Sequence, residues 1–213
     1  MKQVEFYFDV GSPASYLAYK VLPRIAAAAN AEIIWRPMLL GGVFKATGNV
    51  SPLTVPAKAR QMNVDLSIFA DKYDVDYRLC THFPINTLAL MRGATSFLEE
   101  EAFPRYVETV YEAIWRDNKN LNDPTVVREL LAANDFDPDD FMQRIENPVV
   151  KERLKADTSA AVERGIFGAP TMFVGEQMFF GQDRLHFVAE ALGIDFCDVC
   201  PKFIVARSSA NSA

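Results

Sequence analysis

The strongest constraint on the fold is a strand that runs directly into a capped helix at the start of the chain. Val4, Phe6 and Phe8 alternate with polar or amphipathic neighbours, which is the pattern of a half-buried strand. Ser12 then offers a helix cap, and Pro13 suits the first position of a helix. We therefore expect Ser12 at a helix N-terminus, where free N–H groups and the helix dipole favour an anion.

The next elements predict how this strand is paired. The helix is expected to reach about Asn30, with a kink or restart at Pro23. Residues 31–37 form a second predicted strand. Two strands joined by a helix favour a parallel pair with a right-handed crossover.

The middle of the chain, residues 38–165, reads as helical without a convincing strand. Residues 41–52 are rich in turn formers and predict a loop with one short helical turn. Asp or Asn followed by Pro opens three later helices, as caps do. The predicted helices cover about 57–73, 86–101, 102–115, 124–131, 139–145 and 148–164. The aromatic residues predicted to form helical core are Phe97, Phe103, Tyr106 and Trp115.

Strand patterns return near the C-terminus. Residues 171–174 and 177–180 read as an antiparallel hairpin, followed by a helix over 185–192. The full order is β-α-β, a helical block, then β-β-α. This order predicts an α/β thioredoxin-like fold with a large all-helical insertion. The expected units are residues 1–37 with 166–193, the insertion 38–165, and a tail 194–213 whose end is predicted to be disordered.

Two short motifs refine this fold. Pro170 precedes the third strand, where thioredoxin-like folds place a cis-proline, so the backbone of Ala169 is expected to face the helix that starts near Ser12. Disulfide-exchanging members of the fold carry cysteines at the positions held here by Ser12 and Ser15. The chain therefore cannot perform dithiol chemistry there, although it can bind a thiol of another molecule.

Composition excludes several classes of partner. A formal net charge of −6 without a basic stripe argues against nucleic acid. No apolar run of about 18 residues suggests a membrane span, and no apolar leader is seen, so we expect a cytoplasmic protein. The cysteines are Cys80, Cys197 and Cys200, an odd count that does not suggest a disulfide framework. The C-x-x-C pair lies in the tail without further ligands, so we interpret it as incidental and expect no metal.

Four segments together resemble the kappa-class glutathione transferases and, more closely, the bacterial 2-hydroxychromene-2-carboxylate isomerases. Each segment is weak evidence by itself, but their order and separation are specific to the family. The resemblance covers residues 3 to about 193. The segments are Phe6-Tyr7-Phe8-Asp9 with Ser12-Pro13 and Tyr16-Leu17; Gly48-Asn49-Val50; Phe167-Gly168-Ala169-Pro170-Thr171-Met172-Phe173; and Phe180-Gly181-Gln182-Asp183-Arg184-Leu185.

The resemblance implies bound glutathione and a homodimer. Ser12 would donate a hydrogen bond to the sulfur and favour the thiolate. Ala169, before Pro170, would pair through its backbone with the cysteinyl part. The residues implied at the γ-glutamyl end are Gln182 and Asp183, with Phe180 and Gly181 shaping the wall.

The implied reaction interconverts 2-hydroxychromene-2-carboxylate and trans-o-hydroxybenzylidenepyruvate, a step of aromatic degradation. A thiolate can add to the conjugated carbon, permit rotation and leave, so no metal or net redox change is needed. The small aromatic carboxylate needs a cation. Lys45, beside Asn49 in the predicted loop, is the first candidate, followed by Lys58 and Arg36.

The substrate side departs from the family, and this leaves alternatives open. The isomerases carry an Asn-Arg pair for the substrate, and the corresponding stretch here is Leu53-Thr54-Val55. The family also has a substrate lysine, and Phe44 falls near its position, with Lys45 one residue away. A transferase or peroxidase acting on another electrophile, a non-catalytic thiol-binding module, and a redox protein using Cys197 and Cys200 are the competing functions. Ser12 and Asp183 could also be plain helix caps, and Lys45 a solvated charge.

Overall fold

Four strands form one sheet in the computed structural model, which describes residues 1–203. They are β1 (Lys2–Phe8), β2 (Ala31–Pro37), β3 (Thr171–Val174) and β4 (Gln177–Phe180), in the order β2-β1-β3-β4. β1 and β2 are parallel, and the other pairs are antiparallel. Phe6 lies opposite Trp35 on one side and Met172 on the other. The predicted parallel pair and the predicted hairpin are both confirmed.

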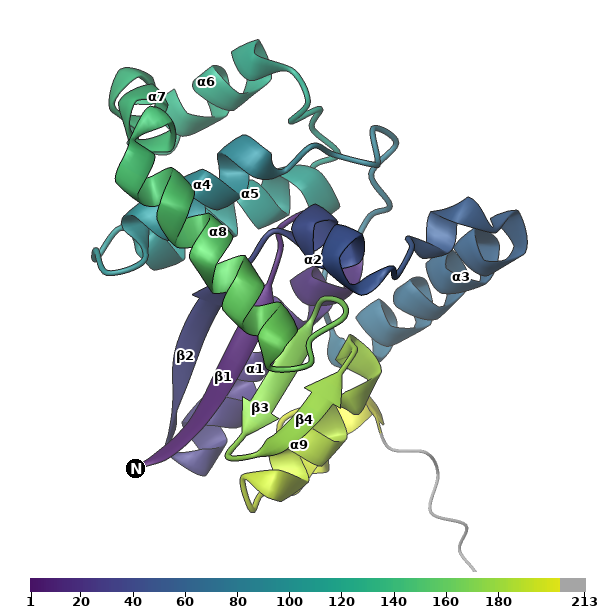
Figure 1. Cartoon of the computed structure of the whole chain (residues 1–213). Helices are drawn as coiled ribbons and strands as arrows, with labels where there is room; N and C mark the ends of the chain where they lie inside the picture. Colours follow the sequence, from purple (N-terminus) through teal and green to yellow (C-terminus); the bar gives the residue numbers. More distant parts are fainter. Residues whose placement is uncertain (204–213) are drawn as a thin grey trace, which may run out of the picture.

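The two faces of the sheet are covered by different helices (Figure 1). α1 (Pro13–Ala29) and α9 (Leu185–Ala191) lie on one face, and α8 (Pro148–Glu163) crosses the other. Since side chains alternate along a strand, Phe6 and Phe8 of β1 join the core with α1, while Tyr7 joins Ala161 of α8. Of the two outcomes predicted at Pro23, a restart is wrong, because α1 continues through that residue as one helix, and a kink stays a prediction.

Residues 38–165 hold helices and no strand, as predicted. The elements not yet named are α2 (Leu40–Thr47), the 3₁₀ turn η1 (Pro52–Thr54), α3 (Pro56–Tyr73), α4 (Leu88–Phe97), α5 (Phe103–Trp115), α6 (Pro124–Ala132) and α7 (Pro138–Glu146). The predicted caps of α6, α7 and α8 are confirmed: each Asp or Asn oxygen accepts the N–H two residues ahead at 2.8–2.9 Å.

The loop predicted over 41–52 is wrong in its first half, where α2 forms a complete helix. Two glycines lower its helix propensity by about 1 kcal/mol each relative to Ala, so contacts from elsewhere must offset them. Val43 is buried with Ala161 of α8, and the N–H of Leu39 donates to Thr158 Oγ1 at 3.0 Å. Gly42 lets the two helices approach, since a Cβ there would lie 3.1 Å from Thr158.

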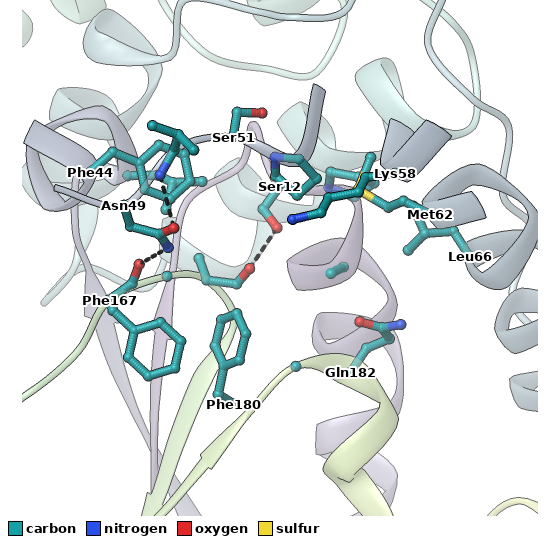
Figure 2. A pocket seen from close by; sticks show the side chains of 18 of the residues that line it. Ser12, Phe44, Asn49, Ser51, Lys58, Met62, Leu66, Phe167, Phe180 and Gln182 are labelled. Atoms are coloured by element: carbon teal, nitrogen blue, oxygen red, sulfur yellow. Dashed lines mark hydrogen bonds between the residues drawn. The ribbon is translucent and has the colours of Figure 1, made fainter. Parts of the chain in front are cut away.

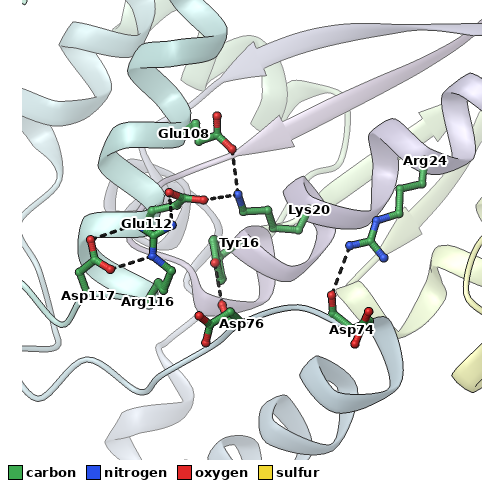
Figure 3. Close-up of polar contacts among 9 residues, drawn as sticks. All are labelled: Tyr16, Lys20, Arg24, Asp74, Asp76, Glu108, Glu112, Arg116 and Asp117. Carbon is green, nitrogen blue, oxygen red and sulfur yellow. Dashed lines mark hydrogen bonds and ion pairs between the residues drawn. The ribbon is translucent and has the colours of Figure 1, made fainter. Parts of the chain in front are cut away.

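The helical segment and the sheet share one core. The indole N–H of Trp115 on α5 donates to the carbonyl of Val10 at 2.8 Å, and the ring is fully buried. Lys20 of α1 donates to Glu108 and Glu112 of α5 at 3.0 and 2.6 Å (Figure 3). One cluster of buried side chains runs through both parts. Such a shared core does not decide whether the two parts are separate domains, so the predicted division stays a prediction.

The chain after α9 folds back onto the core in two 3₁₀ turns, η3 (Phe196–Asp198) and η4 (Pro201–Phe203). Cys200 is buried there, so it is not a thiol in a loose tail. The predicted disorder of the end of the tail concerns residues 204–213, outside the described residues. Within residues 1–203, no helix is both long and apolar enough to cross a membrane.

Candidate functional site

Ser12 is the cap of α1, as predicted, and its hydroxyl group has two protein partners. The Ser12 backbone is extended (φ −95°, ψ 117°), which aims the side chain back over the first turn of the helix. Oγ accepts the N–H of Ser15 at 3.1 Å and donates to the carbonyl oxygen of Ala169 at 3.0 Å. A hydroxyl has one hydrogen to share in a hydrogen bond, and in this structure Ser12 uses it on the Ala169 carbonyl.

The position of Ser12 depends on the buried carboxylate of Asp9, which sequence reasoning missed. Asp9 accepts the N–H groups of Gly11 and Leu40, both at 2.8 Å, and the hydroxyl of Thr87 at 3.1 Å. Burial raises the pKa of this carboxyl, while the three hydrogen bonds act to lower it. The carboxylate thus joins the loop before α1 to the starts of α2 and α4. An Asp two residues before a Gly at a strand end was the available signal.

The peptide bond between Ala169 and Pro170 is cis, as predicted from the motif. The Thr171 hydroxyl donates to Gly168 O at 2.8 Å, and the N–H of Gly181 donates to Pro170 O at 2.9 Å. Gly168 is required for close approach, because a Cβ there would lie 2.7 Å from the ring of Phe180. The N–H of Ala169 donates to no acceptor within residues 1–203.

A cavity of about 930 Å³ lies at Ser12, within the range of about 300–1,000 Å³ typical of small-molecule sites. Its walls come from the start of α1, from α2 and the loop after it, from α3, and from the segments 167–169 and 180–183 (Figure 2). The predicted site residues that line it are Ser12, Asn49, Lys58, Ala169, Phe180, Gly181, Gln182 and Asp183. Pro170 is buried behind this wall.

Lys45 is not on the cavity wall, so the structure corrects the first candidate for the substrate cation. The helical geometry of α2 turns Phe44 toward the cavity and leaves Lys45 exposed outside it. Arg36 is also excluded, since it pairs with Glu5 at 3.1 Å on the sheet. Lys58, near the start of α3, lines the cavity, and Figure 2 shows its amino group pointing toward Ser12.

The charges around the cavity are few. Lys58 is the single cationic side chain on the wall, and no carboxylate pairs with it within residues 1–203. Asp65 and Asp183 are the acidic side chains, and Asp183 forms an ion pair with Arg184. Arg184 therefore partly neutralises the carboxylate that was predicted to bind an ammonium group.

The apolar part of the cavity was only partly visible in the sequence. Met62 and Phe69 line it from α3, although no pocket could be inferred from the predicted helix 57–73. Phe44 and Phe83 also line the cavity, and no local pattern placed them there. Asn49 holds the loop after α2, because its side-chain amide donates to Phe167 O at 2.8 Å.

Comparison with known proteins agrees with this geometry. Residues 3–193 match the family of DSBA-like thioredoxin domains. A 2-hydroxychromene-2-carboxylate isomerase of Sphingobium xenophagum is 33% identical over 90% of this chain and 98% of the relative. The chain belongs to the DsbA-like thioredoxin family, among the 2-hydroxychromene-2-carboxylate isomerases.

Two further relatives extend the comparison. A solved structure of a 2-hydroxychromene-2-carboxylate isomerase superposes with a TM-score of 0.81 at 29% identity, covering 90% of this chain and 94% of that one. Human glutathione S-transferase kappa 1 is 27% identical over 97% of each chain. This member of the isomerase family is therefore an isomerase-like or glutathione-transferase-like enzyme, and the resemblance inferred from the motifs is confirmed.

Proposed function

We propose that the chain is a glutathione-dependent isomerase that interconverts 2-hydroxychromene-2-carboxylate and trans-o-hydroxybenzylidenepyruvate. The observation that carries the proposal is the Ser12 hydroxyl at the N-terminus of α1, facing Ala169 beside cis-Pro170 in a cavity that Lys58 also lines. The names of the relatives supply the reaction.

The residues present suit glutathione. The N–H of Ala169, which has no acceptor within residues 1–203, sits on the cavity wall and can pair with the backbone of an extended peptide. Gly168 leaves room for the Phe180 ring, and Gly181 leaves room for the Asp183 carboxylate, which a Cβ would meet. The Gln182–Asp183 turn offers a side-chain amide and a carboxylate for the γ-glutamyl end.

Ser12 performs two tasks in this proposal. Its hydroxyl turns from Ala169 O toward the sulfur, while the Ser15 N–H keeps Oγ in place. The positive end of α1 favours negative charge at the same point. Bound glutathione supplies a thiolate that adds reversibly to a conjugated carbon and so allows rotation about the former double bond.

Lys58 orients the second substrate in this proposal. An aromatic carboxylate places its ring against apolar walls such as Phe44, Met62 and Phe83, and its charge at the cationic side chain of the wall. In this chain Phe44 falls near the α2 position of the family lysine, and Lys58 of α3 supplies the positive charge instead.

The test is a spectroscopic assay of the chromene carboxylate with and without glutathione. Ser12→Ala should lower kcat/KM about 100-fold, because a donor aimed at developing charge is lost. Ser96→Ala is the matched control, since its hydroxyl donates to Gly93 O within α4, at 2.8 Å and off the cavity wall. Turnover without glutathione, or full activity of Ser12→Ala, contradicts the mechanism.

A second candidate is a kappa-class-like glutathione transferase or peroxidase acting on another electrophile. The altered substrate wall at Phe44, Thr54 and Val55 favours it. The same preparations assayed with 1-chloro-2,4-dinitrobenzene and with cumene hydroperoxide separate the two activities. A homodimer in the cytoplasm forms part of the proposal, and sedimentation and cell fractionation test it.

A further inference from the structure

The Gln182–Asp183 turn is held from outside the cavity by a tyrosine hydroxyl. Tyr73, the last residue of α3, is 1% exposed and donates to the carbonyl oxygen of Gln182 at 2.6 Å. The same oxygen accepts the N–H of Leu185, which closes the 3₁₀ turn η2 (Gln182–Arg184). A three-residue turn has little regularity of its own, so this contact from another element restrains it.

Tyr73 is itself fixed from two sides. Its ring packs against Phe69 at 5.5 Å and, in the C-terminal segment, against Phe196 at 6.0 Å and Phe203 at 5.8 Å between centroids. Arg24 of α1 donates to the carbonyl of Tyr73 at 2.7 Å. It also donates to the carbonyl of Asp74 at 3.4 Å (Figure 3). The backbone and the ring of Tyr73 are therefore held by different parts of the molecule.

We propose that Tyr73 is a positioning residue for the thiol-peptide end of the cavity, and that residues 196–203 set its orientation. The inference rests on the proposed function, since it assigns a support to the turn that would hold the γ-glutamyl group. It also gives a role to a segment beyond residue 193, where the match to the family ends. One helix then serves both ends of the cavity, because α3 carries Lys58 near its start and Tyr73 at its end.

Removal of the hydroxyl with the ring retained tests the proposal in the full chain. Tyr73→Phe should raise the Kd for glutathione about fivefold in calorimetry, the effect of one hydrogen bond. In turnover, KM for glutathione should rise with kcat unchanged. Amide exchange at Leu185 should quicken, since the shared acceptor Gln182 O is less restrained. Phe203→Ala should act in the same direction.

Tyr77→Phe is the matched control, because the Tyr77 hydroxyl is buried and has no hydrogen-bond partner among residues 1–203. It should leave the Kd and the Leu185 exchange rate unchanged. An equal effect of Tyr77→Phe would show general packing and overturn the inference, as would unchanged exchange in Tyr73→Phe. If the wild-type chain binds no glutathione, the proposed function fails, and the exchange measurement alone decides the role of Tyr73.

Discussion

At the scale of single residues, the chemistry of the cavity depends on which groups already have partners. The Ser12 hydroxyl already donates its hydrogen bond to Ala169 O, so a bound sulfur must compete with a backbone carbonyl for that hydrogen bond. Lys58 has no ion-pair partner within residues 1–203 and is available to an anion. The two residues thus respond to ligands differently: Ser12 exchanges one partner for another, while Lys58 gains one.

Substitution of Lys58 by Met removes the charge and keeps most of the side-chain length. We expect KM for the aromatic carboxylate to rise tenfold or more, about the value of a charge-assisted hydrogen bond, with glutathione affinity unchanged. Lys45→Met is the control, since Lys45 is exposed outside the cavity wall. Steady-state kinetics with both substrates varied make the comparison. If only Lys45→Met lost activity, the result would contradict the role of Lys58 and support Lys45, the first candidate from the sequence, as the substrate cation.

At the scale of elements, one carboxylate connects three segments across the sheet. Glu5 of β1 accepts from Arg36 of β2 at 3.1 Å and from Arg164, just after α8, at 2.6 Å. Arg164 also covers the ring of Phe173 on β3 at 3.8 Å. Partial burial raises the pKa of Glu5, but the two guanidinium groups outweigh it and hold that pKa below its usual value of 4.5.

This pairing predicts a pH-dependent stability. Because the pKa of Glu5 is lower in the folded chain, its contribution is present above about pH 4.5 and is lost as pH falls through the folded pKa. Glu5→Gln should cost about 1 kcal/mol of unfolding free energy at pH 7. Urea unfolding should show this difference shrinking toward zero in acid. The exposed Glu176→Gln is the control, and a difference that grows in acid would contradict the assignment.

At the scale of the whole molecule, the inserted helices and the sheet are one packed body around the loop that carries Ser12. Trp115 of α5 reaches the carbonyl of Val10, and Tyr111 packs against Phe8 with ring centroids 6.2 Å apart. The helices therefore complete the core under the site. A chain without them would expose the apolar side of the loop between β1 and α1.

A single cooperative unfolding transition is the expected consequence. The two tryptophans report on the two parts, since Trp35 lies in β2 and Trp115 in α5. Trp115→Phe and Trp35→Phe each leave one tryptophan. In each variant, the unfolding transition followed by fluorescence should coincide with the one followed by far-ultraviolet circular dichroism. Trp115→Phe should also lower the midpoint, because the hydrogen bond to Val10 is lost. Fluorescence and dichroism curves that separate would instead support two independent domains.

Local patterns were sufficient for the order of the elements and for half of the site. Ser12 was predicted as a cap from its neighbours within a few residues, and Pro170 as a cis-proline from its place before the third strand of the predicted fold. The same kind of reasoning failed at α2, whose glycines predict a loop. There, contacts with α8, more than a hundred residues later in the chain, override the local preference.

The sequence by itself therefore determined the thioredoxin-like order, the serines in place of cysteines and the resemblance to the isomerases. Only the tertiary structure decided that Phe44 and Lys58, rather than Lys45, face the cavity, and that Asp9 and Tyr73 hold its two ends. The reason is physical. A side chain's direction depends on the packing of its element, and the partners of Asp9 and Tyr73 lie as far as 78 and 109 residues away in the chain.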